Sequence, residues 1–403
     1  MVADIRLTEP ADKNRPKYPP EPTPQTTRNV PEDYPSVMAA YQDAPPGTTI
    51  SVGSGVNCGD LNLSRDLDPN NPIILRSRDR LGALLDNQVK LAGKGHWLHG
   101  FKQTFKVTSK GDGGIVVAAD FITLTKMEIQ SPHGITSSEP KRADVRIGWC
   151  YFSGKNANTS AISNIFFKIP NGGQYSRSSD GPCRIYIYNN DFDDDGSRPS
   201  GVPMEDHCIY FGDSKPKGDD VVCMEDVELD HNLIRDSNKR VRGFYMKRGA
   251  YLFQNSLLGA RHNWGIRHGG NARIEANIAK GSAKLVLNGK GHKLYNNSWE
   301  KQCDLYAGAS KNGRGPLYQA ASDAELDMNE GPLSIGYISG SHQLDSSQGG
   351  KIDHCTIWRH IGTVDEVAAN IDSSAFNIRD QPRVGASYLE RVLLTPADVG
   401  MAG

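Results

Sequence analysis

The sequence predicts an all-β protein that folds as a single-stranded, right-handed parallel β-helix with a short N-terminal capping helix. Three observations support this prediction: a turn-rich composition, a motif that returns every 20 to 26 residues, and an Asn that recurs at one place in that motif. The 403 residues include 42 Gly, and this frequency of turn formers is typical of β-rich rather than α/β proteins. No apolar run reaches the ~18 residues that suggest a membrane span.

The repeated motif is an aliphatic residue, two variable positions, then Asn, Cys or an apolar residue, one variable position and an apolar residue. Its central copies start 23, 22 and 20 residues apart, and gaps of 40 and 42 residues earlier in the chain are near two periods each. The 58-residue gap after Leu294 fits two coils with a long loop. Repeats of this length bury their apolar side chains only by stacking on one another. Copies begin at Leu98, Leu124, Ile147, Ile187, Leu229, Leu252, Ile274, Leu294, Ile352 and Leu389.

Two other repeat architectures fit the sequence less well. A leucine-rich repeat has a similar period, but the chain lacks both its LxxLxL pattern and a helical half-repeat. A propeller needs units of ~40 residues. A parallel β-helix therefore remains the predicted fold.

Asn side chains recur at one place in the motif and predict a ladder of hydrogen bonds. In stacked coils, such an Asn can bond the equivalent Asn above and below. The chain has seven Cys with no metal-binding spacing, and Cys150 and Cys355 take the same motif position, so most of the Cys are predicted as buried thiols. The Asn of the predicted ladder are Asn190, Asn232, Asn255, Asn277 and Asn297.

The N-terminal region divides at about residue 34. Residues 1–33 are Pro-rich and polar and are predicted as an extended arm, and 34–403 as the β-helix. Asp33–Ala44 has the pattern of a short amphipathic helix, which would cover the open end of the strand stack. The next stretch, TTISVGSG, is predicted as the first strand.

Cations gather between Arg240 and Gly270, although the whole chain has a formal net charge of only −1. Counting back from the ladder Asn places Arg242, Trp264 and Lys284 in one column of successive coils, and Tyr245 and Arg267 in another. The near-neutral net charge argues against nucleic acid as the partner, and the local cationic wall predicts another anionic polymer as the ligand. A solvated charged face is the alternative. The wall comprises Arg240, Arg242, Tyr245, Lys247, Arg248, Arg261, His262, Arg267, His268 and Lys284.

This region resembles the catalytic segment of polysaccharide lyase family 6, the alginate lyase and chondroitinase B family. The resemblance rests on WGIRHGG at 264–270, on AKLVLNGKGHKLYNN at 283–297, and on Asn232-Leu233 upstream of Lys247. It implies a parallel β-helix that cleaves a uronate-containing polysaccharide, with Lys247 as Brønsted base and Arg267 assisting as acid or charge stabiliser. His268 corresponds to the histidine of the RHG motif. We expect a secreted or periplasmic monomer that binds neither nucleic acid nor membrane, although no signal peptide is visible.

The sequence departs from that family at its calcium ligands. The family pattern has acidic residues five and seven positions before the Lys, where this chain has Arg242 and Arg240. We therefore expect no calcium at that place. Arginines would neutralise the substrate carboxylate instead and lower the pKa of Lys247 by like-charge repulsion. The predicted substrate-binding residues are Arg240, Arg242, Tyr245, Arg248, His262, Trp264, His268, Lys284 and Arg314.

Two other classes of function remain open from the sequence. A β-helix glycoside hydrolase would need paired carboxylates, and the nearby acidic residues are Asp193, Asp195, Glu205 and Asp206. A non-catalytic, tailspike-like polysaccharide binder would need none. The run from Asp191 to Asp195 has oxygen ligands suited to calcium, but it lacks the spaced acidic pattern of a known calcium loop, which favours an Asp/Gly turn.

Overall fold

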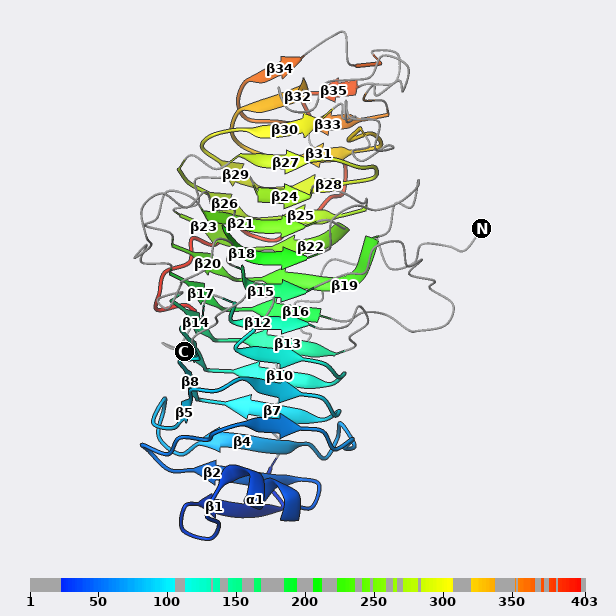
Figure 1. Ribbon diagram of the computed structural model, residues 1–403. Helices are drawn as coiled ribbons and strands as arrows, with labels where there is room; N and C mark the ends of the chain where they lie inside the picture. The colour runs from blue at the N-terminus through cyan, green and yellow to red at the C-terminus, as the bar shows by residue number, and fades with distance from the viewer. Residues whose placement is uncertain are drawn as a thin grey trace, which may run out of the picture.

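Stacked parallel strands in three sheets form most of the part of the chain that the structure describes (Figure 1). Sheets A and C run along nearly the whole stack, and sheet B extends from β5 to β29. From β4 to β30, successive strands of the chain belong to sheets A, B and C in turn, so each of these coils contributes one strand to each sheet. The computed structural model describes residues 23–105, 113–131, 133–137, 144–153, 163–167, 185–193, 206–211, 223–235, 241–246, 249–258, 264–266, 271–281, 284–306, 320–337, 352, 354–366, 371–372, 377–381 and 383–399.

The strands of each sheet follow in stacking order. Sheet A consists of β1 (Thr26–Val30), β2 (Thr48–Val52), β4 (Ile73–Ser77), β7 (His96–His99), β10 (Ile122–Thr125), β13 (Val145–Gly148), β16 (Ile185–Tyr188), β19 (Cys223–Asp230), β22 (Gly249–Phe253), β25 (Arg273–Glu275), β28 (Lys293–Tyr295), β31 (Glu325–Asp327), β33 (Thr356–Trp358) and β35 (Asn377–Arg379). Sheet B consists of β5 (Leu84–Leu85), β8 (Lys102–Gln103), β11 (Glu128–Ile129), β14 (Tyr151–Phe152), β17 (Asp191–Phe192), β20 (Leu233–Ile234), β23 (Ser256–Leu257), β26 (Ile278–Ala279) and β29 (Ser298–Trp299). Sheet C consists of β3 (Leu61–Leu63), β6 (Val89–Leu91), β9 (Ile115–Val117), β12 (Ile135–Ser137), β15 (Ser163–Phe167), β18 (Asp206–Phe211), β21 (Val241–Met246), β24 (Trp264–Ile266), β27 (Leu285–Leu287), β30 (Cys303–Tyr306), β32 (Leu333–Tyr337) and β34 (Val364–Glu366).

The register of sheet A confirms the sequence repeat from Leu98 to Leu294. The aliphatic residues that open these eight copies pair directly from strand to strand. The gaps of 40 and 42 residues are each a single coil, because Ile187 pairs with both Ile147 and Leu229. The prediction of two periods there was wrong, since residues added between two strands lengthen a coil without adding another.

Two copies of the motif were misplaced. After Leu294 the stack continues through Leu326 and then Ile357, which confirms two coils in the long gap. Cys355 lies just before β33, so it is not at the ladder position that the sequence suggested. The copy at Leu389 lies outside all three sheets. The motif is short, so it also matches the turn that precedes a sheet A strand. In that turn too, a residue with positive φ, such as His354, comes just before a buried residue, such as Cys355.

Apolar side chains fill the interior of the coils as one continuous core from Val30 to Ile371. Alternate residues of each strand point inward, as Leu285 and Leu287 of β27 do, both fully buried. Buried cysteines were also predicted correctly where their side chains are described, namely for Cys58, Cys150, Cys208, Cys303 and Cys355. The side chain of Cys223 is not described. Cys183 lies outside the described residues.

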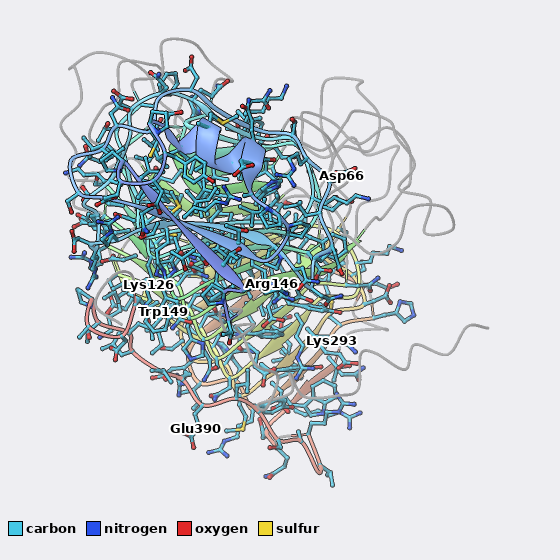
Figure 2. All side chains as sticks on the ribbon, turned by 90° about the horizontal axis from the view of Figure 1, so that it is seen from below. Asp66, Lys126, Arg146, Trp149, Lys293 and Glu390 are labelled. Carbon is cyan, nitrogen blue, oxygen red and sulfur yellow. The ribbon has the colours of Figure 1, made fainter. Side chains whose placement is uncertain are left out.

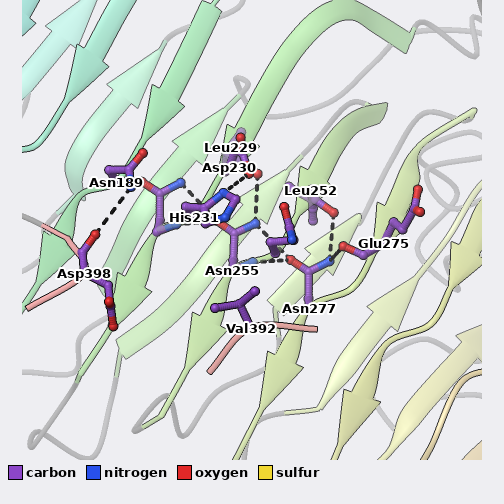
Figure 3. Close-up of polar contacts among 12 residues, drawn as sticks. Asn189, Leu229, Asp230, His231, Leu252, Asn255, Glu275, Asn277, Val392 and Asp398 are labelled. Atoms are coloured by element: carbon purple, nitrogen blue, oxygen red, sulfur yellow. Dashed lines mark hydrogen bonds and ion pairs between the residues drawn. The ribbon is translucent and has the colours of Figure 1, made fainter. Parts of the chain in front are cut away.

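The predicted Asn ladder is present and one Asn longer than expected. In each step, an Asn side-chain oxygen accepts hydrogen bonds from the backbone and side-chain N–H groups of the Asn one coil earlier. Asn255 Oδ1 accepts from Asn232 at 2.9 and 3.0 Å, and Asn255 Nδ2 donates to Leu229 O at 2.8 Å (Figure 3). The ladder runs through Asn190, Asn232, Asn255, Asn277, Asn297 and Asn329.

A tight turn of constant length precedes every ladder position. One residue with positive φ links the sheet A strand to the ladder residue, as Lys126, Trp149 and Gln254 do with φ of 55, 56 and 49°. Figure 2 looks along the stack and shows Lys126 and Trp149 together at one corner of the coil. This constant turn explains why residue counting works between sheets A and B.

A short helix closes the N-terminal end, as predicted. Helix α1 (Val37–Asp43) begins after Ser36, whose side chain accepts the Ala39 N–H. Its buried side chains are Val37, Ala40 and Tyr41. Strand β1 (Thr26–Val30) pairs with β2, so the stack starts before the predicted boundary at residue 34. Among the described residues, no helix has the length and apolarity to cross a membrane.

The C-terminal segment returns along the outside of the stack, and we call residues 383–399 the C-terminal strap. Its Leu389 N–H donates to Glu275 Oε1 at 2.6 Å, and Asn296 Nδ2 donates to Leu389 O at 2.8 Å. Further along, Leu394 and Val399 pack against Leu233. The strap therefore crosses coils that precede it by more than a hundred residues (Figure 1).

Replacing one Asn of the ladder tests its contribution to stability. Asn255→Ala leaves Asn232 N–H and Leu229 O without their partners, and each buried unpaired group costs about 1–3 kcal/mol. We expect a loss of about 3 kcal/mol or more in the free energy of unfolding, measured by urea denaturation. Asn62→Ala, at an exposed position of β3, is the matched control, with a change of about 0.5 kcal/mol or less. Equal effects of the two substitutions would contradict the ladder's role.

Candidate functional site

Sheet C carries the region in which the sequence places the site. Of the eleven predicted site residues, the side chains of Trp264 and Lys284 are described, and the backbone alone of Arg242 and Tyr245. The other seven lie outside the part of the chain that the structure describes: Arg240, Lys247, Arg248, His262, Arg267, His268 and Arg314.

The strands that precede the two predicted catalytic residues are hydrogen-bonded neighbours. In the parallel pair β21–β24, Tyr245 is opposite Gly265 and Met246 is opposite Ile266. Lys247 follows Met246 in the sequence, and Arg267 follows Ile266. The expectation that this part of the chain forms successive coils with a period of about twenty residues is therefore confirmed for β21 and β24.

The columns predicted by counting back from the ladder Asn need correction. Tyr245 shares its column with Gly265, not with Arg267, and Trp264 is opposite Leu285 rather than Lys284. The cause lies in the segments that connect sheet C to sheet A, which contain two residues after β21, six after β24 and five after β27. Because these segments differ in length, residues at equal distance before the ladder Asn do not share a column in sheet C.

One column of sheet C passes through Tyr245. One coil earlier it contains Tyr210, whose ring lies 5.0 Å from that of Phe166 at 42°. After Tyr245 the column reaches Gly265, which has no side chain and a φ of +118°. A Cβ there would lie 2.5 Å from Val286 O. The close approach of the Gly265 and Val286 backbones thus requires a glycine at 265. The position opposite Tyr245 in this column therefore has no side chain.

Trp264 does not lie on the substrate-facing surface. Its side chain is 2% exposed and belongs to the hydrophobic core. The neighbouring Gly265 faces outward, so alternation along β24 turns Trp264 inward. The predicted role of Trp264 as a substrate contact is therefore corrected: it is a core residue.

Lys284 is described, and its partner is an acid that the sequence did not single out. Lys284 Nζ lies 3.4 Å from Asp304 Oδ2, with the Lys side chain 25% exposed and the Asp side chain fully buried. Burial raises the pKa of the Asp304 carboxyl, while Lys284 and Gln302 oppose that rise. Asp304 lies in the same outward column as Gly265, two coils further on. No motif surrounds Asp304, so only the register reveals it.

The calcium implied by the resemblance does not fit the residues at this place. Calcium takes oxygen ligands, whereas a guanidinium has donors only. The pair β18–β21 sets Arg242 opposite His207, so neither residue at this register position carries a carboxylate. By residue type, Arg240 and Arg242 supply no oxygen ligand for calcium, and Arg240 lies outside the part of the chain that the structure describes.

The acidic residues of sheet B form a separate cluster around Arg235. Its guanidinium donates to both Asp191 oxygens at 2.9 and 2.6 Å and lies 3.2 Å from Asp193. Tyr151 donates to Asp193 at 3.3 Å. Burial is the main cause that raises the pKa of Tyr151 to about 12. Both carboxylates are thereby engaged, which favours a structural role over the alternative of a calcium loop; Asp195 lies outside the described residues.

Comparisons with known proteins give structural matches only. No protein-family model matches the chain, and neither does any curated protein sequence. A mannuronic-acid-specific family 6 lyase from the human gut microbiota matches with a TM-score of 0.62 and 15% identity, over 91% of this chain and 89% of that one. A family 6 polysaccharide lyase from Pseudopedobacter saltans matches with a TM-score of 0.60 and 14% identity, over 94% and 99%.

A third match shows that the fold also occurs within longer chains. The family 6 alginate lyase AlyGC matches with a TM-score of 0.58 and 14% identity, and the match covers 92% of this chain but 53% of AlyGC. At these identities the comparison establishes the fold alone. Over more than nine-tenths of its length, this chain is similar in fold to polysaccharide lyases of family 6.

Proposed function

We propose that this protein is a polysaccharide lyase that cleaves a uronate-containing polymer by β-elimination. The observation that carries the proposal is the pairing of β21 with β24, which sets the strands before Lys247 and Arg267 side by side. The similarity in fold to lyases of alginate and mannuronate supports the same reaction class. An alginate-like polymer is therefore the substrate that we propose to test first.

The chemistry assigns a role to each group of cations. Elimination removes the proton at C5 of the uronate and expels the sugar linked at C4. The neighbouring carboxylate is already negative, so positive charge must stabilise the enolate-like intermediate. In the proposed mechanism, Lys247 removes the C5 proton as an uncharged amine, and Arg267 stabilises charge or assists protonation of the leaving oxygen.

Arginines take the place of a metal in this proposal. Arg240 and Arg242 neutralise the substrate carboxylate, because a guanidinium is always charged and can bind both carboxylate oxygens at once. Lys284 contributes further positive charge from the coil after Arg267. Tyr245 shares its column with Gly265, and we propose that the sugar ring passes over that glycine. Arg248, His262, His268 and Arg314 remain proposed substrate contacts.

The glycoside-hydrolase alternative finds less support. It needs two carboxylates facing one groove, but Asp193 directly follows β17 of sheet B, whereas Asp206 begins β18 of sheet C. Asp193 is also engaged by Arg235 and Tyr151. These two acids therefore belong to different faces of the stack.

Removing the proposed base should abolish lyase activity. Lys247→Ala is expected to lower kcat by ~10²–10⁴-fold, the usual contribution of a general base. The measurement is the ultraviolet absorbance of the unsaturated product during digestion of alginate. Lys280→Ala, an exposed lysine after β26, is the matched control and should keep full activity. A Lys247→Ala variant as active as the unaltered protein would exclude this mechanism, and reducing ends without ultraviolet absorbance would indicate a hydrolase.

Activity should not depend on a divalent metal. Digestion in EDTA is expected to proceed at the same rate as digestion with added calcium, because the Arg pair replaces the ligands. Arg242→Ala should lower the rate by ~10²-fold or more, since an unneutralised carboxylate destabilises the intermediate. Loss of activity in EDTA with recovery on adding calcium would show that the arginine part of the proposal is wrong.

A further inference from the structure

Asp304 is an acid in an unusual position. Its strand neighbours Cys303 and Leu305 are fully buried and point into the core, so alternation turns Asp304 to the outward face of sheet C. Its side chain is nevertheless fully buried, and its Oδ1 has no hydrogen-bond partner among the described residues. A buried carboxylate held by a single cation is costly unless the pair serves another purpose.

Lys284 approaches Asp304 from the preceding coil as a diagonal neighbour. The register sets Val286 opposite Asp304, and Lys284 lies two residues before Val286, on the same outward face. Diagonal neighbours of this kind are within reach of long side chains. The Lys284 carbonyl also accepts the Trp264 N–H at 2.9 Å, which ties the backbone of Lys284 to the coil that includes the proposed site.

The two ends of this ion pair differ in exposure. The Asp304 side chain is inaccessible, whereas the Lys284 side chain retains a quarter of its exposure. An ammonium can donate to more than one acceptor at once. The Asp304 carboxylate is therefore fixed in the interior, and the Lys284 ammonium reaches the surface next to the column of Tyr245 and Gly265.

We propose that Asp304 is a positioning residue that holds the Lys284 ammonium on the outward face of sheet C, where Lys284 binds a carboxylate of the uronate polymer. This inference rests on the proposed function and adds a determinant of substrate affinity to it. The flexible Lys side chain would otherwise adopt many rotamers, and binding a carboxylate would then cost the entropy of fixing one rotamer. Asp304 fixes the Lys284 rotamer before the substrate binds, and does not itself contact the substrate.

A double-mutant cycle tests the inference. Asp304→Asn keeps the size of the side chain and removes its charge. Lys284→Gln shortens the side chain and removes the cation. We expect each single variant to raise KM for alginate about 5- to 10-fold with kcat changed less than about twofold, the pattern of lost binding without lost catalysis. The double variant should match the worse single variant, because residues that act as one unit are not additive.

The controls separate positioning from general effects on charge or folding. Lys293→Ala, on the outward face of sheet A, removes one positive charge elsewhere and should leave KM unchanged. Thermal unfolding of each variant checks folding; Lys284→Gln changes a partly exposed side chain and remains informative if Asp304→Asn is unstable. An unchanged KM in Lys284→Gln, or additive effects in the double variant, would overturn the inference.

Failure of the proposed function gives a different result from failure of this inference. If the unaltered protein releases no unsaturated product, the lyase proposal fails. Calorimetric binding of alginate oligosaccharides then provides the readout for the same variants. Affinity lost equally in Asp304→Asn and Lys284→Gln supports the positioning role without catalysis, and unchanged affinity overturns it.

Discussion

All strand pairs in the described part of this protein are parallel, and they keep their register except for irregularities in β19–β22 and β30–β32. The backbone groups of each coil must therefore align with those of the coil before it. The Asn ladder meets this requirement where the chain turns from sheet A to sheet B. An amide side chain suits this turn because it has both an acceptor for the N–H groups of the neighbouring coil and a donor for a carbonyl of that coil. Cys150 ends the ladder, with its N–H bound by Asn190 Oδ1 at 2.9 Å. The ladder thus holds the turns between sheets A and B in line from Asn190 to Asn329.

The sequence predicted the fold and the alignment of sheet A, but it predicted the site only in part. Leu98 to Leu294 could be aligned because one residue of positive φ and one ladder residue always separate sheets A and B. Tyr245 and Arg267 could not, because the segments between sheets C and A differ in length. Trp264 was placed on the surface since a single Trp beside a Gly gives no sign of which way it faces. Asp304 carries no motif, and only the pairing with Val286 brings it to the site's column.

The low identity to proteins of the same fold has a physical reason in the core. Leu98, Leu124 and Ile147 occupy equivalent inward positions of successive coils, and any aliphatic residue of similar volume would stack there. The stack constrains spacing and volume more than residue type. Side chains on the outward columns can therefore change without disturbing the coils.

The C-terminal strap bears on the order in which the protein folds. A stack of this kind can grow coil by coil from the end capped by α1, since each coil needs only its predecessor. The strap breaks that locality: Asn189 and Asp398, which share a hydrogen bond, are 209 residues apart in the chain. Contacts of such sequence separation form late because of the loop-closure entropy they require. During synthesis, the corner from Asn189 to Asp327 therefore stays uncovered until the strap emerges, and a variant that lacks the strap would expose the middle of its stack rather than its end.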